Sequence, residues 1–285
     1  MPSSSPLVEL LRFLDDLHER VERTWWGAVV TDSRFPLLWE ANYAAVDTPA
    51  ADLSLAEVRE VLHSAVREAG ASHEHVWIMQ PHATACLLGD LAEEGRPVHW
   101  DDLLRHGPRA PVEPPAYPVE EAGDLDVAFW GRQRSALREF GITEPAVVEQ
   151  VLRRQREVVA PAGKRWFTAR EEDQVAGMGS MVVHGRTAYV DDVVTFPAFR
   201  RRGVARSVVA AMLGAARAAG AEETFLFADQ PGPVRLYEGL GFEVAERVAT
   251  SLGRLPGAQP LEARPGGPSR RTSERSTGRG PGRPR

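Results

Sequence analysis

Five prolines between His106 and Pro118 constrain the fold of this chain more than any other sequence feature. Proline fixes φ and has no amide proton, so such a run cannot pass through the interior of a helix or a sheet. The chain has 285 residues, which is long for one domain and sufficient for two. Segment 106–117 is therefore predicted to link an N-terminal domain, residues 1–105, to a second domain that begins at residue 118.

Composition places the chain among globular proteins, with 43% hydrophobic and 26% charged residues. No apolar stretch reaches the roughly 18 residues of a membrane span, and the first residues lack the basic and apolar regions of a secretory signal. The single cysteine, Cys86, cannot form an internal disulfide, which fits a reducing compartment. We therefore expect a cytoplasmic protein that does not associate with a membrane.

Charge is distributed unevenly along the chain. The last segment, 253–285, contains eight arginines and two glutamates, so the remaining body is more acidic than the net charge of −6 suggests. An acidic body argues against a nucleic-acid-binding domain and favours cationic substrates such as amines, although solubility alone also explains it. The tail has almost no apolar residues and is expected to be disordered, with contact to nucleic acid or to an acidic partner as the alternative.

In the N-terminal domain, apolar residues recur alternately with the period of a helix and with that of a strand. A capping box formed by Ser54 and Glu57 marks the start of one helix. The expected helices are residues 7–21, 54–70 and 83–94, and the expected strands are 26–31, 35–45, 75–79 and 97–100.

The C-terminal domain, residues 118–252, shows a similar alternation. His184, Gly185 and Arg186 are expected to form a tight hairpin turn, in which glycine supplies positive φ. The expected helices are residues 125–140, 144–158, 203–219 and 233–240, and the expected strands are 164–170, 174–184, 187–196, 223–228 and 242–248.

One segment of this second domain carries a chemical signature. A β-branched strand ends at Pro197, and a helix begins directly after Gly203. The turn between them contains three consecutive arginines, residues 200–202. A helix N-terminus presents unpaired amides and about half a positive charge, and small residues allow a phosphate to approach those amides closely. The turn is therefore a candidate pyrophosphate site, the alternative being a tight turn with surface arginines.

The same segment resembles a family signature. Arg200, Gly203 and Ala205 match the Gln/Arg-x-x-Gly-x-Gly/Ala pattern of GNAT N-acyltransferases, and residues 229–242 resemble that family's Asn-x-x-Ala-x-x-Leu-Tyr-x-x-x-Gly-Phe segment. The two matches occur in the family's order, separated by one helix and one strand, and the resemblance covers about residues 118–252. It implies an α/β (α+β) fold with a mixed, mostly antiparallel sheet flanked by helices.

The resemblance also implies how coenzyme A binds. The backbone of strand residues 194–196 would pair with the pantetheine arm, and the amides of the turn would hold the pyrophosphate. Gln230 stands where the family usually has asparagine, and Pro233 where alanine is common, which puts one contact to the coenzyme arm in doubt. The residues assigned to the coenzyme are Val194, Thr195, Phe196, Arg201, Arg202, Gly203, Val204, Ala205, Arg206 and Gln230.

For catalysis, the resemblance indicates Tyr237 as the acid that protonates the departing thiolate, because a phenol with a pKa of about 10 suits that role. A tyrosine that only packs under the sheet is the alternative. Asp191 or Asp192, on the strand before the turn, would accept the proton of the amine, and a solvated strand end is the alternative. A regular strand would direct these two side chains to opposite faces, so no metal site is expected.

The N-terminal domain has an element order similar to a shortened copy of the C-terminal one, but it contains no Arg-x-x-Gly-x-Gly/Ala. The chain therefore resembles tandem GNAT proteins in which one copy has lost coenzyme binding, and an unrelated α/β lobe stays open. Its expected role is to complete the acceptor cleft or to support the active domain. The aromatic residues Trp25, Trp26, Trp39 and Tyr43 are expected to pack in a core rather than to line a pocket.

The predicted activity is transfer of an acetyl group from acetyl-CoA to an amine, by direct attack in a ternary complex without a metal. No cysteine lies near either motif, which argues against a covalent acyl-enzyme. A non-catalytic acyl-CoA-binding or regulatory module is the second hypothesis, and nucleic-acid binding through the tail is the third. The sequence does not specify whether the acceptor is a small amine, an antibiotic, an amino acid or a protein N-terminus, and both a monomer and a dimer stay open.

Overall fold

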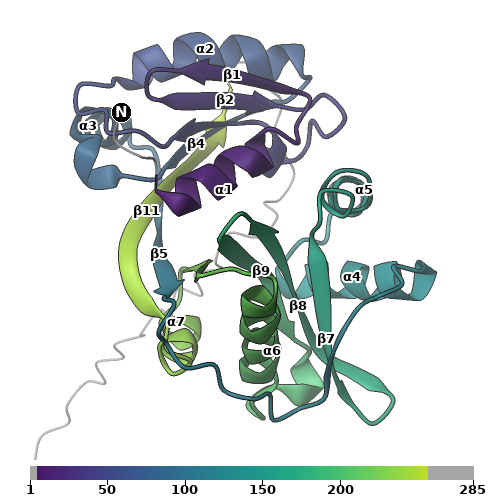
Figure 1. Cartoon of the computed structure of the whole chain (residues 1–285). Coiled ribbons are helices and arrows are strands. Elements are labelled where there is room, and N and C mark those ends of the chain that lie inside the picture. Colours follow the sequence, from purple (N-terminus) through teal and green to yellow (C-terminus); the bar gives the residue numbers. More distant parts are fainter. Residues whose placement is uncertain (1–4, 256–285) are drawn as a thin grey trace, which may run out of the picture.

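The computed structural model describes residues 5–255, which form two lobes joined by one continuous β-sheet (Figure 1). The α-helices are α1 (Pro6–Asp15), α2 (Leu55–Glu68), α3 (Ala85–Glu93), α4 (Val127–Glu139), α5 (Pro145–Arg154), α6 (Val204–Ala218) and α7 (Pro231–Glu238). The strands are β1 (Arg20–Thr24), β2 (Gly27–Thr31), β3 (Tyr43–Val46), β4 (His73–Ile78), β5 (Val98–His106), β6 (Val119–Glu121), β7 (Arg165–Glu171), β8 (Gln174–His184), β9 (Thr187–Thr195), β10 (Glu223–Ala228) and β11 (Glu243–Arg254).

The eleven strands of the described chain have the order β1-β2-β3-β4-β11-β5-β10-β9-β8-β7-β6. Neighbouring strands are antiparallel except for two parallel pairs, β3 with β4 and β9 with β10. Helices flank this sheet in both lobes (Figure 1). The predicted fold class, a mixed and mostly antiparallel sheet with flanking helices, is confirmed.

The sheet has the same topology on both sides of its central pair, β11 and β5. In the N-terminal lobe, β1, β2 and β3 lead through α2 into the parallel strand β4. In the C-terminal lobe, β7, β8 and β9 lead through α6 into the parallel strand β10. Helices α3 and α7 then follow at equivalent places. The N-terminal lobe is thus a shortened topological copy of the C-terminal lobe.

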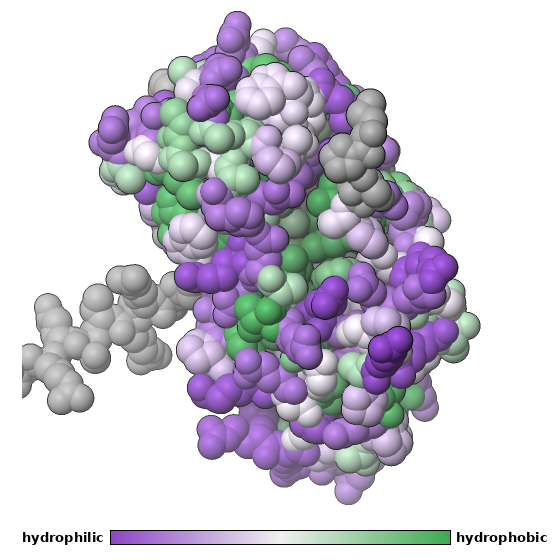
Figure 2. Space-filling view, turned by 60° about the vertical axis from the view of Figure 1, so that its left-hand side comes forward, coloured by the Kyte–Doolittle hydropathy of each residue, from purple (hydrophilic) through white to green (hydrophobic). Residues whose placement is uncertain are grey.

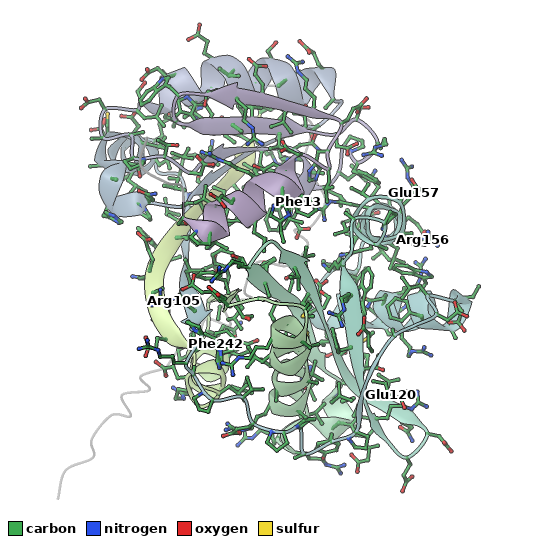
Figure 3. All side chains as sticks on the ribbon, in the orientation of Figure 1. Phe13, Arg105, Glu120, Arg156, Glu157 and Phe242 are labelled. Carbon is green, nitrogen blue, oxygen red and sulfur yellow. The ribbon has the colours of Figure 1, made fainter. Side chains whose placement is uncertain are left out.

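The two lobes exchange their last strands. β5 leaves the N-terminal lobe and pairs with β10, whereas β11 leaves the C-terminal lobe and pairs with β4. The exchanged strands also pair with each other, and in Figure 1 they cross between the lobes side by side. In Figure 3, Arg105 on β5 and Phe242 just before β11 mark this crossing. Each lobe therefore completes its sheet with backbone hydrogen bonds from the other lobe.

Apolar side chains follow the exchange. Leu10 of α1, Leu103 of β5 and Val248 of β11 belong to one buried cluster that draws on both lobes. Leu104 belongs to the core of the C-terminal lobe together with the inner side of α6. In the last turn of α1, the Phe13 ring stacks on His184, with 4.3 Å between the ring centroids (Figure 3). The first helix therefore contacts the β8–β9 hairpin. These contacts join the lobes into one packed unit.

The first helix is shorter than the apolar spacing predicts. The sequence indicates residues 7–21, whereas α1 ends at Asp15. The carboxylate of Asp15 is buried and accepts a hydrogen bond from the Tyr43 hydroxyl, with 2.6 Å between the oxygens. Residues 20–24 pair with β2 as an edge strand instead of continuing the helix. The apolar residues that recur at helical spacing in residues 7–21 therefore belong to two elements, α1 and β1, and to the turn between them.

Segment 35–45 is a loop with a 3-10 turn at Trp39–Ala41, not the predicted strand, and β3 begins only at Tyr43. The buried side chain of Asn42 explains this difference. Its oxygen accepts a hydrogen bond from the Asp32 amide, and its nitrogen donates to two carbonyl oxygens of the loop. One side chain thus satisfies backbone groups that a strand would satisfy by pairing.

The strand expected at residues 97–100 extends to His106, because the exchange gives β5 partners that its local sequence does not indicate. β11 continues to Arg254, and from residue 256 onward the segment predicted as a disordered tail lies outside the described residues. Within residues 5–255, no helix is long and apolar enough to cross a membrane.

We predict that Leu104→Ala destabilises both lobes together. Leu104 is fully buried on an exchanged strand, and truncating a buried leucine costs about 2–5 kcal/mol. Urea unfolding followed by tryptophan fluorescence and by circular dichroism should give one shared transition at a lower midpoint. Val244→Ala is the matched control, because Val244 is the cross-strand neighbour of Leu104 but is 45% exposed. Two separated transitions would contradict the single unit.

Candidate active site

The site begins where β9 and β10 separate. The parallel pairing between them covers only Thr187–Tyr189 against Glu223–Phe225. Beyond this point β9 keeps its pairing with β8 on one edge, up to Thr195, while its other edge has left β10. Backbone amides and carbonyls on that free edge are available to an extended ligand. The predicted pantetheine-pairing residues, 194–196, lie at the end of this edge.

The turn after β9 presents a helix N-terminus. A short 3-10 turn, Pro197–Phe199, leads to Gly203, which occupies the N-cap position of α6 with φ +84°. Gly203 has no side chain to cap the helix, so no side-chain oxygen competes for the amides of the first turn. Arg201 also has positive φ, at +68°, although it is not glycine. This strained turn thus leads into a helix N-terminus without a side-chain cap, which is the kind of end that binds anions.

Close packing beneath the turn fixes its position. A Cβ atom added at Gly177 of β8 would lie 2.7 Å from the carbonyl oxygen of Val194 and 2.7 Å from a methyl group of Val204. Because no side chain larger than hydrogen fits, β8 can approach both the end of β9 and the start of α6. The glycine therefore holds the strand end and the helix N-terminus in one rigid arrangement.

Most arginines near the turn are paired with glutamates. Arg200 bonds Glu139 at 2.5 Å, and Arg202 bonds Glu171 at 2.9 Å. Farther along α6, Arg206 and Glu113 form a third such pair at 2.6 Å. Among residues 5–255, Arg201 forms no hydrogen bond or ion pair. The structure thus leaves one arginine of the turn free to meet an anion, rather than three.

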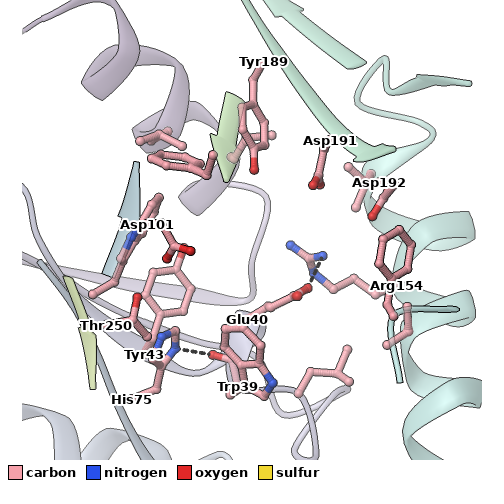
Figure 4. A pocket seen from close by; sticks show the side chains of 18 of the residues that line it. Trp39, Glu40, Tyr43, His75, Asp101, Arg154, Tyr189, Asp191, Asp192 and Thr250 are labelled. Carbon is pink, nitrogen blue, oxygen red and sulfur yellow. Dashed lines mark hydrogen bonds and ion pairs between the residues drawn. The ribbon is translucent and has the colours of Figure 1, made fainter. Parts of the chain in front are cut away.

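A β-bulge in β9 places Asp191 and Asp192 on the same face. Two residues of β9 lie opposite one residue of β8 at this point, and Asp192 has φ +53°. Both carboxylates line one cavity (Figure 4). The expectation for a regular strand, that the two side chains diverge, is therefore wrong here, because the extra residue of a bulge shifts the alternation of side chains by one position.

Lys164 holds this acid pair. Its ammonium lies 2.7 Å from Asp192 and 3.4 Å from Asp191, and its side chain is only 5% exposed. Ser180 donates a further hydrogen bond to Asp192, at 2.9 Å. Burial alone would raise the pKa of Asp192, but the charge of Lys164 lowers it below its ordinary value. Burial and the neighbouring Asp192 charge raise the pKa of Asp191. One carboxylate is thus kept ionised, and the other is the more basic.

Tyr237, on α7, is 9% exposed and packs against Phe242 with 5.9 Å between ring centroids. Burial raises the pKa of Tyr237 to about 12, with a smaller contribution from the charge of Asp191. The ring belongs to the core cluster of the C-terminal lobe and does not line the cavity. Gln230 is exposed at the N-cap position of α7 and makes no side-chain cap.

The cavity lies between the lobes and has a volume of about 590 Å³. Its walls include Asp191 and Asp192 of β9, Asp101 of β5 and several aromatic rings. Apolar surface also gathers at the waist between the lobes in the space-filling view (Figure 2). Since β9 reaches the cavity at Asp191 and the turn a few residues later, one strand connects the acid pair to the candidate pyrophosphate site.

The N-terminal aromatic residues divide between core and cavity. Trp26 is buried in the core of its lobe, as predicted, and Trp25 is 59% exposed. Trp39 lines the cavity, which corrects the prediction that it packs in a core, whereas Tyr43 is buried in a core cluster as predicted and also lines the cavity (Figure 4). The loop around Asn42, rather than a strand, carries Trp39 to this position.

Residues 132–242 match the model of the acetyltransferase (GNAT) family. The C-terminal lobe belongs to the GNAT family. The matched region contains the free edge of β9, the turn and α7. Predicted membership from the two sequence signatures is therefore confirmed.

Solved structures with this fold extend over both lobes. A GCN5-related N-acetyltransferase from Kribbella flavida is 19% identical, covers 90% of this chain and 97% of its own, and has a TM-score of 0.63. A functionally unknown conserved protein from Staphylococcus epidermidis is 14% identical, with coverages of 80% and 90% and a TM-score of 0.61. A GCN5-related N-acetyltransferase from Sphaerobacter thermophilus is 19% identical, with coverages of 70% and 67% and a TM-score of 0.53. At these identities the likeness concerns the fold alone. No curated protein matches the chain.

In the N-terminal lobe, protein side chains occupy the topologically equivalent helix N-terminus. At the equivalent helix, α2, Ser54 caps the Glu57 amide, and the Glu57 carboxylate bonds back to the Ser54 amide. The Asp90 carboxylate accepts a hydrogen bond from the Leu55 amide, at 2.7 Å. Protein carboxylates thus occupy the positive end of the helix where an anionic ligand would bind. This occupation gives a physical reason for the missing signature in the first lobe.

Sequence reasoning missed Lys164, Ser180, Arg154 and Asp101. One signal could have found the first of these, because Lys164 is the only lysine among 34 basic residues. Arginine carries a larger, planar guanidinium instead of a compact ammonium, so it does not replace lysine freely at a compact buried site. Asp101 and Arg154 carry no local signal, since the exchange of strands and the packing of α5 bring them to the cavity.

We predict that Lys164→Met lowers stability more at about pH 7 than at about pH 2. Because Lys164 depresses the pKa of Asp192, its contribution is present above the ordinary value of 3.8 and is lost as pH falls through the folded value. The cost at high pH should be about 2 kcal/mol, below the 3–5 kcal/mol of a fully buried pair, since both carboxylates face the cavity. Urea unfolding measures both values. Adding Asp192→Asn should restore part of the loss, and no restoration would contradict this account.

Proposed function

We propose that the protein transfers an acetyl group from acetyl-CoA to an amine that binds in the cavity between the lobes. One observation carries the proposal. The free edge of β9 runs from the acid pair in the cavity, past the bulge, to the turn that leads to the uncapped N-terminus of α6. A thioester on an arm that follows this edge would reach Asp191 while its pyrophosphate meets the helix.

Coenzyme A would bind mainly through backbone groups. Residues 194–196 would pair with the amides of the pantetheine arm, as a further strand on the free edge. The first amides of α6, from Val204 to Arg206, would hold the pyrophosphate, helped by the unpaired Arg201. Gln230 would contact the arm across the gap from α7. A chain that uses backbone atoms in this way tolerates the departures from the family pattern at Gln230 and Pro233.

The acceptor would arrive as an ammonium ion and lose one proton to Asp191, whose raised pKa makes it the better base of the pair. Asp192 stays ionised beside Lys164 and attracts the cation. The neutral amine then attacks the thioester carbonyl, forming the C–N bond. The C–S bond breaks as the intermediate collapses, and the nitrogen releases its second proton to solvent. No thiol acts as an intermediate carrier, because the only cysteine, Cys86, is exposed on α3 and does not line the cavity.

Tyr237 would protonate the departing sulfur. With a pKa of about 12 it remains protonated throughout the working range, but it is a weaker acid than a free phenol. Proton transfer would therefore accompany the growth of negative charge on sulfur rather than precede it. The alternative, a non-catalytic acyl-CoA-binding module, is supported by the burial of Tyr237 outside the cavity lining.

We predict that Gly203→Glu abolishes the binding of acetyl-CoA measured by calorimetry. The added carboxylate would meet the pyrophosphate and also places an L-residue at φ +84°. Gly220→Glu is the matched control, because Gly220 follows the other end of α6 with φ +88° and equally open surroundings. The control should bind acetyl-CoA like the wild type. Absence of binding by folded wild-type protein would reject both the transferase and the binding-module hypotheses.

We predict that Asp191→Asn lowers kcat/KM at least about a hundredfold, whereas Tyr237→Phe lowers kcat by roughly 10–100-fold and leaves acetyl-CoA affinity unchanged. In the wild type, kcat/KM should rise with pH through the raised pKa of Asp191, since only the ionised carboxylate accepts a proton. Release of free thiol measures both rates. A rise with pH that persists in Asp191→Asn would assign the base elsewhere.

A further inference from the structure

We propose that the acceptor is a small molecule with at least two amino groups, and that Asp101 and Asp229 bind the amino group that does not react. The inference rests on the proposed function, because it assigns the remainder of the same cavity. It also gives the N-terminal lobe a role in substrate choice, since Asp101 lies on the exchanged strand β5.

Within residues 5–255, the cavity holds a second acidic centre without a counter-ion. Asp101 and Asp229 both line the cavity, and neither forms an ion pair within the described part of the chain. Burial raises the pKa of Asp101 to about 6, and the charge of Asp229 raises it further than burial alone would. Two carboxylates brought together in this way repel each other, and a bound ammonium would remove that repulsion.

The cationic side chains that line the cavity, Lys164 and Arg154, already pair with other carboxylates. Lys164 is bonded to Asp191 and Asp192. Arg154 lies 3.7 Å from Glu40 and also contacts His18, both in the N-terminal lobe (Figure 4). Neither cation pairs with Asp101. A ligand that carried only the reacting amine would therefore leave the second centre uncompensated, and an anionic ligand would meet more carboxylates than cations.

Two buried side chains of the cavity wall carry hydrogen-bond acceptors without a partner. His75 is 4% exposed, and its Nδ1 lies 2.9 Å from the Trp39 carbonyl oxygen. A carbonyl only accepts, so Nδ1 carries the proton and Nε2 is a bare acceptor without a partner. Burial lowers the pKa of His75 to about 3, which keeps the ring neutral. On the opposite lobe, Gln155 is 9% exposed, lines the cavity and has an unpartnered Oε1. Both residues line the cavity and carry an acceptor without a donor partner, and a ligand with several amino groups is rich in donors.

The walls between these polar groups suit the body of such a ligand. Trp39, Trp77 and Phe227 line the cavity together with Tyr189, and Trp100 is 38% exposed there. Aromatic faces bind alkyl chains through apolar contact and ammonium groups through cation–π attraction. Acidic centres separated by aromatic surface thus match amino groups separated by a hydrocarbon segment.

The experiment uses the full chain saturated with coenzyme A. Calorimetry would measure the binding of α,ω-diamines from diaminopropane to diaminooctane and of n-alkylamines of the same lengths. We expect one diamine length to bind about tenfold more tightly than its matched monoamine, because it adds one charge-assisted hydrogen-bonded contact. Asp101→Asn should remove most of this preference.

Asp102→Asn is the matched control. Asp102 is the next residue on β5, but it does not line the cavity and pairs with Arg247 at 3.4 Å. It should keep the diamine preference although it removes the same charge from the same strand. Equal binding of diamines and monoamines at every length, or a preference that survives Asp101→Asn, would overturn the proposal.

The two proposals fail separately. Acetyl transfer to monoamines and diamines at equal efficiency would leave the transferase proposal intact and reject the second acidic centre. Asp101-dependent binding of diamines without any thiol release from acetyl-CoA would support the second centre and reject the transferase proposal.

Discussion

The antiparallel pair of β5 and β11 is the constraint on which the rest of the structure depends. Each strand completes the sheet of the lobe that it did not come from, so backbone hydrogen bonds rather than a loop interface join the lobes. Such bonds fix register and orientation together, since a slip of one residue would turn Leu103 and Leu104 to the wrong faces. The cavity between the lobes is therefore built on a rigid frame and not on a hinge.

Within this frame, a short stretch of β9 performs two tasks by departing from regular geometry. Loss of pairing with β10 leaves one edge of its backbone without a strand partner, and the bulge turns both aspartates toward the cavity. The bulge is stabilised by the buried Lys164, because two adjacent carboxylates on one face would otherwise repel each other. The arrangement differentiates chemically similar residues: Asp192 is a fixed charge, and Asp191 is left with the higher proton affinity.

In the C-terminal lobe, the sequence was sufficient for the strand, basic turn and helix around Gly203, which carry a local signal in residue type and spacing. It was also sufficient for the capping box at Ser54, which the structure confirms. It did not indicate β5 beyond Trp100 or the cavity position of Asp101, because long-range strand pairing leaves no periodicity that a local window detects. The prediction of a strand at residues 35–45 failed for a different reason. The buried side chain of Asn42 bonds the backbone of a loop there, although the apolar pattern favoured a strand.

The exchange of strands also has a consequence for how the chain is made. β4 ends at Ile78, but its partner β11 begins only at Glu243, so one edge of β4 stays unpaired while the intervening chain is synthesised. At ordinary rates of translation this interval lasts roughly ten to thirty seconds. An unpaired edge of a buried strand is a template for pairing with other chains. The nascent first lobe therefore carries this open strand edge until the last strand of the chain is synthesised.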